Sequence, residues 1–407
     1  MNRIIAAILA ILITSLGCWA QQAGKLYDQG IEKMKIKDYK AAIGLFTKVI
    51  SINTSYYEAN LERGKCYEII GKSDSAIIDY ETAIVKNPKY AKGFYYRGLY
   101  YTSKKDYPKA IADFSKVIAL KPELTDGWNA RADTYITISN WQNAKSDLTE
   151  LEHIKNDDFT IFLRRGKCNT QLNHYSEAMA DFNKAIQLKP DAGEAYLLRG
   201  IQYQQNGKYA NAANDYTKAV SLKFEDQQLY TRRADCYYIS EQWDNAIKDF
   251  TTLITTYKSK SADVYAKRGD CYTQKGNYPL AQKDFNKAIL FERDNYLTYV
   301  NRGKVYLKIN KANQAMLDFR KATEINPNGW EAFLYRGITY FDQKKIKLAL
   351  DDLNQAIKLN PTSGIAYFYR GACKDNLNDA AGGCTDLKKA AELGYKEAEE
   401  RVQKYCR

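Results

Sequence analysis

The chain has 407 residues, a formal net charge of +13 and 45% hydrophobic residues. This apolar content excludes an intrinsically disordered chain, because enough side chains are available to bury a core. Seven prolines and 23 glycines exclude collagen-like and low-complexity sequence, and eight cysteines are too few for a disulfide-stapled scaffold. A chain longer than about 300 residues predicts several globular domains or a repeat array whose core grows in one dimension.

The N-terminal segment has the features of an export signal. A basic start at residues 1–3 precedes an apolar run over residues 4–16, and small residues flank a cleavage point after Ala20. This pattern predicts a signal peptide over residues 1–20 and an exported protein, periplasmic or secreted. In the alternative interpretation, Cys18 is the lipidated first residue of a bacterial lipoprotein. The residues before Gly17 fit a lipidation signal poorly, which favours simple cleavage.

An arginine followed by Gly or Ala recurs every 34 residues, with one step of 35. These arginines are Arg63, Arg97, Arg131, Arg165, Arg199, Arg233, Arg268, Arg302, Arg336 and Arg370. A further copy at Gln29-Gly30 makes eleven units. If the small residue is position 8, the units begin at residues 23, 57, 91, 125, 159, 193, 227, 262, 296, 330 and 364. The array therefore spans residues 23–397.

Each unit has the pattern of two amphipathic helices. Position 4 is aromatic in nine units and position 11 is Tyr in eight, and positions 4, 8 and 11 share one helical face. Position 20 is Ala in ten units, and position 24 is Phe, Tyr or Leu in all eleven. The small residue at position 8 lets the second helix approach closely, so each unit is predicted to be a helical hairpin.

This pattern resembles the tetratricopeptide repeat (TPR), which has a large residue at position 4, small residues at 8 and 20, Tyr at 11 and Pro at 32. The resemblance implies an all-α, right-handed superhelical solenoid of about eleven helix-turn-helix units. Proline is present at position 32 in five units: Pro88, Pro122, Pro190, Pro327 and Pro361. The polar segment 396–406 is predicted to be a capping helix, because a repeat array must end on a surface that faces water.

Aspartate recurs at position 23 in ten units: Asp79, Asp113, Asp147, Asp181, Asp215, Asp249, Asp284, Asp318, Asp352 and Asp386. A charge that recurs with the repeat indicates a structural role, so we expect these aspartates to pair with the position-7 arginines. This pairing argues against the arginines as a nucleic-acid site. Each exposed pair would contribute ~0 to 1 kcal/mol, whereas removing one partner of a buried pair would cost several times more.

The resemblance also implies a protein-interaction scaffold whose concave groove holds a peptide segment or helix of another protein. Aromatic residues at groove positions 5 and 12 are Tyr27, Tyr95, Tyr238, Phe341 and Phe368, and candidate polar contacts are Lys65, Arg164, Lys167, Asn301 and Lys304. Acidic residues outnumber lysines at groove positions 2 and 9, so the groove is not a basic channel. The family's clamp for a C-terminal carboxylate needs Lys at position 5 and Asn at position 9, which this sequence lacks.

Lysines recur at position 26 of the second helix: Lys48, Lys116, Lys184, Lys218, Lys287, Lys321 and Lys389. They are predicted to form an outer stripe, which is either a solvated face or a binding surface for an anionic envelope polymer or membrane. Export and the acidic groove argue against a nucleic-acid partner, and a monomer is expected. The two histidines, His153 and His174, have no thiol or carboxylate at ligand spacing, so we expect no metal, no cofactor and no enzyme activity.

The cysteines form two groups. Cys66, Cys168, Cys236, Cys271 and Cys373 all occupy position 10 and are predicted to be free, partly buried residues. Cys384 and Cys406 lie in the last unit and at the end of the capping segment, in a chain predicted to enter an oxidising compartment. We therefore hypothesise a disulfide between them that staples the cap.

Overall fold

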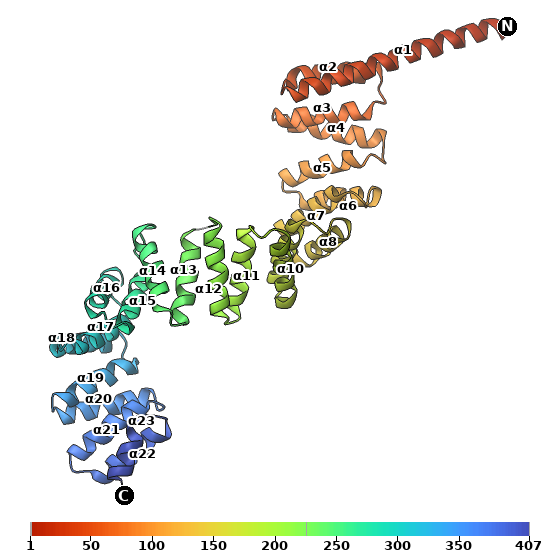
Figure 1. The fold of residues 1–407 in the computed structure, drawn as a ribbon. Helices are drawn as coiled ribbons and strands as arrows, with labels where there is room; N and C mark the ends of the chain where they lie inside the picture. Colours follow the sequence, from red (N-terminus) through yellow and green to blue (C-terminus); the bar gives the residue numbers. More distant parts are fainter. Residues whose placement is uncertain (1, 225, 407) are drawn as a thin grey trace. The chain divides into compact units, whose positions relative to one another are not determined.

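The computed structural model describes residues 2–224 and 226–406, and the side chains of residues 2–18 and 405 lie outside that description. The described part of the chain is all-α, with 23 helices and no strand. The chain divides into two compact units, residues 1–202 and 203–407, and the boundary falls within one helix, α11. In each unit, successive helices lie side by side along the chain (Figure 1).

The helices of the first unit, including the one that crosses the boundary, are α1 (Asn2–Lys35), α2 (Tyr39–Ile52), α3 (Tyr57–Ile69), α4 (Ser73–Lys86), α5 (Ala91–Ser103), α6 (Tyr107–Leu120), α7 (Thr125–Thr137), α8 (Trp141–Ile154), α9 (Phe159–Gln171), α10 (Tyr175–Leu188) and α11 (Gly193–Gln205). The remaining helices are α12 (Tyr209–Ser221), α13 (Gln227–Ile239), α14 (Trp243–Thr255), α15 (Ala262–Gln274), α16 (Tyr278–Phe291), α17 (Tyr296–Lys308), α18 (Ala312–Ile325), α19 (Trp330–Asp342), α20 (Ile346–Leu359), α21 (Gly364–Asn376), α22 (Ala380–Glu392) and α23 (Lys396–Tyr405).

The helix boundaries follow the 34-residue spacing. From α3 onward, the first helix of each pair begins at the residue that this spacing gives as position 1. Position 15 has a positive φ in every turn between the paired helices, at Lys37, Gly71, Lys105, Ser139, Asn173, Gly207, Glu241, Gly276, Asn310, Lys344 and Asn378. A left-handed residue ends a helix by turning its last carbonyls away from the helical path. The all-α array of helix pairs predicted from the sequence is therefore confirmed.

The close approach of paired helices depends on the glycine at position 8 and the ring at position 24. A Cβ atom added to Gly98 would lie 2.6 Å from the ring of Phe114, and one added to Gly303 would lie 2.5 Å from the ring of Phe319. Both distances are far below van der Waals contact, so the ring occupies the space that a side chain at position 8 would need. The rings are fully or almost fully buried, which makes them the centre of each hairpin's core.

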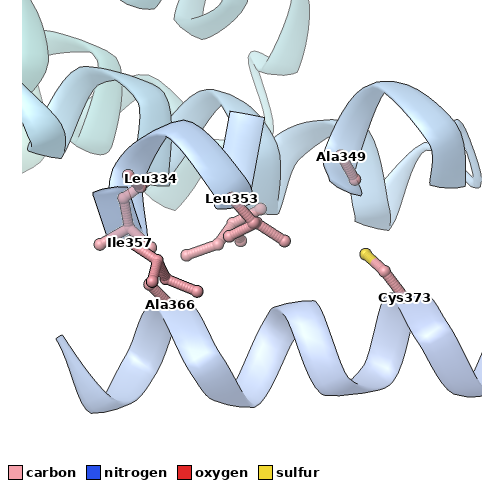
Figure 2. Close-up of a cluster of buried hydrophobic side chains, with 8 residues drawn as sticks. Leu334, Ala349, Leu353, Ile357, Ala366 and Cys373 are labelled. Atoms are coloured by element: carbon pink, nitrogen blue, oxygen red, sulfur yellow. The ribbon is translucent and has the colours of Figure 1, made fainter. Parts of the chain in front are cut away.

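Each second helix also packs against the first helix of the next repeat. Figure 2 shows one such cluster, in which Leu334 of α19, Leu353 and Ile357 of α20, and Ala366 and Cys373 of α21 converge. Burying a Leu or Ile side chain stabilises a fold by about 1.5 to 3 kcal/mol. Because such clusters recur along each unit, stability is distributed among neighbouring repeats.

The two ends of the array differ from its middle. Helix α1 runs without a break from Asn2 to Lys35, so it joins the predicted signal segment to the first repeat helix. The side chain of Cys18, the candidate lipidation residue, lies outside the described part of the chain, as do most side chains of residues 1–20. Cleavage after Ala20 and lipidation of Cys18 therefore stay predictions. None of the helices in the described part of the chain has the length and apolar content needed to span a bilayer. At the other end, α23 packs on α22, and a disulfide joins Cys384 to Cys406 with a Cα–Cα distance of 5.4 Å.

Candidate partner-binding face

The first helix of each pair presents side chains at five positions besides 4, 8 and 11, and at position 5 some of them are buried, as Leu61 and Leu334 are. Positions 2, 5, 6, 9 and 12 provide these side chains, and we call the surface that they form within each unit the first-helix face. Because positions three and four apart share a side of a helix, this face is continuous along each first helix. It contains the ten groove residues predicted from the sequence as aromatic or polar partner contacts.

Residues on neighbouring first helices contact one another in a regular way. At five places in the described repeats, position 9 of one repeat contacts position 6 of the next, 31 or 32 residues later in the sequence. Three such contacts are polar, at 2.6 Å for Asp133 and Arg164, 2.8 Å for Asp235 and Lys267, and 3.0 Å for Asp270 and Asn301. Two place a lysine Nζ over a tyrosine ring, at 4.8 Å for Lys65 and Tyr96 and 5.1 Å for Lys304 and Tyr335. Two of these five contacts pair opposite charges within the chain.

The predicted contacts Arg164 and Lys167 are both held by neighbouring repeats. Arg164 on α9 donates from Nη1 to Asn129 Oδ1 at 2.8 Å and from Nη2 to Asp133 Oδ1 at 2.6 Å. Lys167 forms an ion pair with Glu194 of α11 at 2.6 Å. A partner must compete with these contacts, so the two residues are less available than their sequence positions suggest.

In the second unit, polar side chains of the face converge on Asp270 of α15. Tyr238 on α13 donates its hydroxyl to Asp270 Oδ2 at 3.2 Å, and Asn301 on α17 donates to Oδ1 at 3.0 Å. Burial raises the pKa of Asp270 to about 6, although the hydrogen bond from Tyr238 and the charge of Lys304 oppose the increase. This carboxyl group therefore changes its charge near neutral pH.

The first-helix face is hollowed between α5 and α7. A pocket of about 220 Å³ lies there, with Tyr95, Leu99, Phe114, Asp126 and Asp133 among its lining residues. Tyr95 is half-buried, and burial, followed by the charge of Asp126, raises its pKa. The sequence pattern placed Tyr95 on this face but gave no sign of the pocket beside it.

The remaining aromatic candidates differ in their exposure. Phe341 on α19 packs edge-on against Tyr369 of α21, with ring centroids 5.7 Å apart, so it is partly covered by the next repeat. The expectation that Phe368 lines the groove is wrong, since its side chain is buried with Leu387 in the last core cluster. Position 5 is buried in interior repeats as well, as at Leu61 and Leu334, and the Phe368 ring also packs against Tyr395, with ring centroids 5.0 Å apart.

The arginines at position 7 have a structural role. Nine of them donate from Nε and Nη2 to the aspartate of their own repeat: Arg63–Asp79, Arg97–Asp113, Arg131–Asp147, Arg165–Asp181, Arg233–Asp249, Arg268–Asp284, Arg302–Asp318, Arg336–Asp352 and Arg370–Asp386. The aspartates are buried, and the guanidinium groups lie over the aromatic rings at position 4, as Arg131 does over Trp128 at 5.3 Å. These arginines are unavailable to a nucleic acid, because their donors and their flat faces are already used.

The third arginine nitrogen links adjacent repeats, a contact that sequence reasoning missed. Nη1 of Arg131 donates to Ser115 of the preceding repeat at 2.8 Å, and Nη1 of Arg268 donates to Thr251 at 3.0 Å. Both acceptors occupy position 25, where Thr, Ser or Asn recurs in most units. That recurrence was the available signal for this contact.

The position-26 lysines lie on the second helices, away from the first-helix face. Six of the seven are exposed and Lys184 is half-buried, so the sequence correctly placed them on the surface. Two of them lie within 3.4 Å of a glutamate on the same helix, Glu324 for Lys321 and Glu392 for Lys389. Over the described residues, no three His, Cys, Asp or Glu side chains gather in a way that would hold a metal ion.

Comparisons with known families agree with this geometry. Family models described as tetratricopeptide repeat match residues 91–124, 193–226, 262–295, 296–328 and 330–363, and a model described as TPR repeat matches residues 166–207. The chain therefore contains tetratricopeptide repeats, and its fold is an all-α repeat array. No curated protein matches the chain.

The chain is similar to several solved structures at low sequence identity. A tetratricopeptide repeat protein from Parabacteroides merdae is 20% identical, with 63% of this chain and 100% of that chain covered and a TM-score of 0.43. The C-terminal part of a TPR repeat-containing protein from Cytophaga hutchinsonii is also 20% identical, with 58% and 96% covered and a TM-score of 0.47. The Cut9–Hcn1 hetero-tetramer of APC/C gives 14% identity, 95% and 96% coverage and a TM-score of 0.47.

Proposed function

We propose that this chain is a non-catalytic scaffold that binds a segment of another protein on its first-helix face. TPR proteins generally mediate protein–protein interactions. The observation that carries the proposal is the pocket between α5 and α7, which opens on the first-helix face beside Tyr95 and Asp126. A preformed surface of this kind binds without a large reorganisation cost.

The proposal places the scaffold in the bacterial cell envelope, as a periplasmic or secreted monomer cleaved near Ala20. The basic and apolar leader over residues 1–16 supports export, and so does the disulfide between Cys384 and Cys406, since such bonds persist in oxidising compartments. The competing form is a lipoprotein anchored at Cys18. Mass spectrometry of the mature N-terminus separates the two, because only the anchored form retains Cys18 with attached acyl chains.

A crosslinked pull-down from envelope extracts tests the proposal, with washes at low and at high salt. One variant carries Arg164→Glu and Lys167→Glu on the first-helix face, and its control carries Lys116→Glu and Lys287→Glu on the position-26 stripe. Both make the same change in charge, and circular dichroism checks that both remain folded. We expect a protein partner that survives the high-salt wash and is lost from the face variant only. Equal recovery by wild type and face variant would contradict the proposal.

A second candidate function is the binding of an anionic envelope polymer or membrane surface through the position-26 lysines. The exposure of six of these lysines favours it. In the same experiment this function predicts recovery of salt-labile anionic material, because contacts between exposed charges are screened by salt. The stripe variant, rather than the face variant, would then lose binding.

A further inference from the structure

The pocket between α5 and α7 has the size of one amino-acid side chain. Its volume of about 220 Å³ adjoins a second hollow of about 120 Å³, and Tyr95 and Asp126 line both. Sites for whole small molecules occupy about 300 to 1,000 Å³, so this space suits a single long side chain better. Leu99 and Phe114 provide apolar walls.

The charge at this pocket is negative, although the chain as a whole carries +13. Asp126 and Asp133 are both exposed at its rim. Asp133 is held by Arg164, whereas Asp126 makes no ion pair with any residue in the described part of the chain at 4.0 Å or less. One lysine, Lys92, lines the smaller hollow and is exposed. The pocket therefore combines an aromatic ring, apolar walls and a carboxylate without an ionic partner.

We propose that this pocket receives an arginine or lysine side chain of the partner segment. The aliphatic stem would lie against Leu99 and Phe114, and the cationic end would meet the Asp126 carboxylate beside the Tyr95 ring. Cations are attracted to the face of a tyrosine ring and to a carboxylate at once, which gives a basic side chain two favourable contacts that a neutral one lacks. This inference rests on the proposed function, because it specifies the chemistry of the segment bound on the first-helix face.

Two blocked, otherwise uncharged peptides test the inference, one with a single arginine and one with the isosteric neutral residue citrulline at the same place. Saturation-transfer NMR on the full chain measures both affinities, since this method detects weak binding. We expect the arginine peptide to bind about three- to tenfold more tightly than the citrulline peptide, with the difference falling as salt is raised. The variant Asp126→Asn should remove most of this preference.

Two further variants make the result specific to this pocket. Asp28→Asn makes the same change on an exposed carboxylate of α1, also on the first-helix face, and should leave the preference intact. Lys92→Gln removes a neighbouring cation and should strengthen arginine binding. Equal binding of the two peptides, binding of neither, or equal losses in Asp126→Asn and Asp28→Asn would overturn the inference. The pull-down separates the two proposals. If the Arg164 and Lys167 variant loses a captured partner but Asp126→Asn keeps it, the proposed function stands and the inference about this pocket is wrong.

Discussion

Arg233 and Asp249 face each other across α13 and α14 through two parallel hydrogen bonds of 2.7 Å, from Nε and Nη2 to the two carboxylate oxygens. Their side chains are 9% and 2% exposed, which makes this the least exposed such pair in the described repeats. Desolvation raises the pKa of Asp249, while the pKa of Arg233 is raised despite desolvation by its hydrogen bond to Asp249. The aspartate thus depends on its partner to remain charged in the core.

Removing either member of this buried pair should be costly. The variant Asp249→Ala leaves a buried guanidinium without its carboxylate, and we expect a loss of about 3 to 5 kcal/mol in local stability. Hydrogen exchange of the α13 and α14 amides measures this loss, because long repeat arrays need not unfold in one step. The control is Asp244→Ala, which breaks an exposed pair with Lys275 and should cost ~0 to 1 kcal/mol. A loss in Asp249→Ala as small as the loss in Asp244→Ala would mean that the buried pair is not important for stability.

The two glycines Gly303 and Gly269 provide a matched test of ring packing. An added Cβ would lie 2.5 Å from the Phe319 ring in the first case and 3.1 Å from the Phe285 ring in the second. Alanine gains about 1 kcal/mol over glycine in helix propensity, whereas overpacking costs about 1 to 3 kcal/mol. We expect Gly303→Ala to lower the urea midpoint and Gly269→Ala to leave it unchanged or raise it. A larger drop in the urea midpoint for Gly269→Ala than for Gly303→Ala would show that ring contact does not determine the cost of a side chain at position 8.

The half-buried carboxyl of Asp270 predicts a pH dependence of stability. Its pKa is about 6 in the folded chain against an ordinary value of 3.8, because burial disfavours the carboxylate. The folded chain therefore binds the proton more tightly than the unfolded chain, and the stabilisation from protonation is lost as the pH rises from about 4 through 6. Asp270→Asn cannot lose a proton, so its thermal midpoint relative to wild type should be higher at pH 7.5 than at pH 4. Asp375→Asn, on an exposed carboxylate of α21, should show no such difference.

The position-10 thiols should be unreactive in the folded protein. Burial raises the pKa to about 11 for Cys66, Cys168 and Cys373, and to about 12 for Cys236 and Cys271, so almost no thiolate forms at pH 8. Maleimide should label none of them in native protein and all five after unfolding without reductant, with Cys18 as a sixth if the leader is retained. Labelling of Cys384 or Cys406 under those conditions would contradict the disulfide.

Reduction of that disulfide should loosen the C-terminal cap. The bond closes a loop with a sequence separation of 22 residues, for which loop-closure entropy gives a stabilisation of about 3 kcal/mol. We expect Cys406→Ser to speed hydrogen exchange in α23 and the adjoining α22, while α19 and α20 exchange as in wild type. An unchanged α23 would show that the contacts of Ala398 and Val402 hold the cap without the bond.

The fold was predictable because each hairpin is encoded locally. The small residue at position 8, the ring at position 24 and their 16-residue separation specify one hairpin, and its repetition specifies the array. The recurrence of Arg at position 7 and Asp at position 23 predicted that these residues pair, but not whether each pair lies within one unit or joins two. The pairing of Asp133 with Arg164 was not predicted, because it depends on how a second helix spaces two first helices, which the pattern of a single repeat does not contain. The pocket beside Tyr95 depends in the same way on the side chains of α5, α6 and α7 together.

The contact between position 9 and the following position 6 means that the repeats are not interchangeable building blocks. If residues 262–295 were excised and the chain rejoined, Asp235 would meet Asn301 in place of Lys267 and would lose its ion pair. A shuffled array would keep every hairpin intact and still carry mismatched neighbours along its surface. The side chains at positions 9 and 6 therefore match only in the present order of repeats. A redesign of this protein that adds or removes repeats has to substitute both members of each affected contact together.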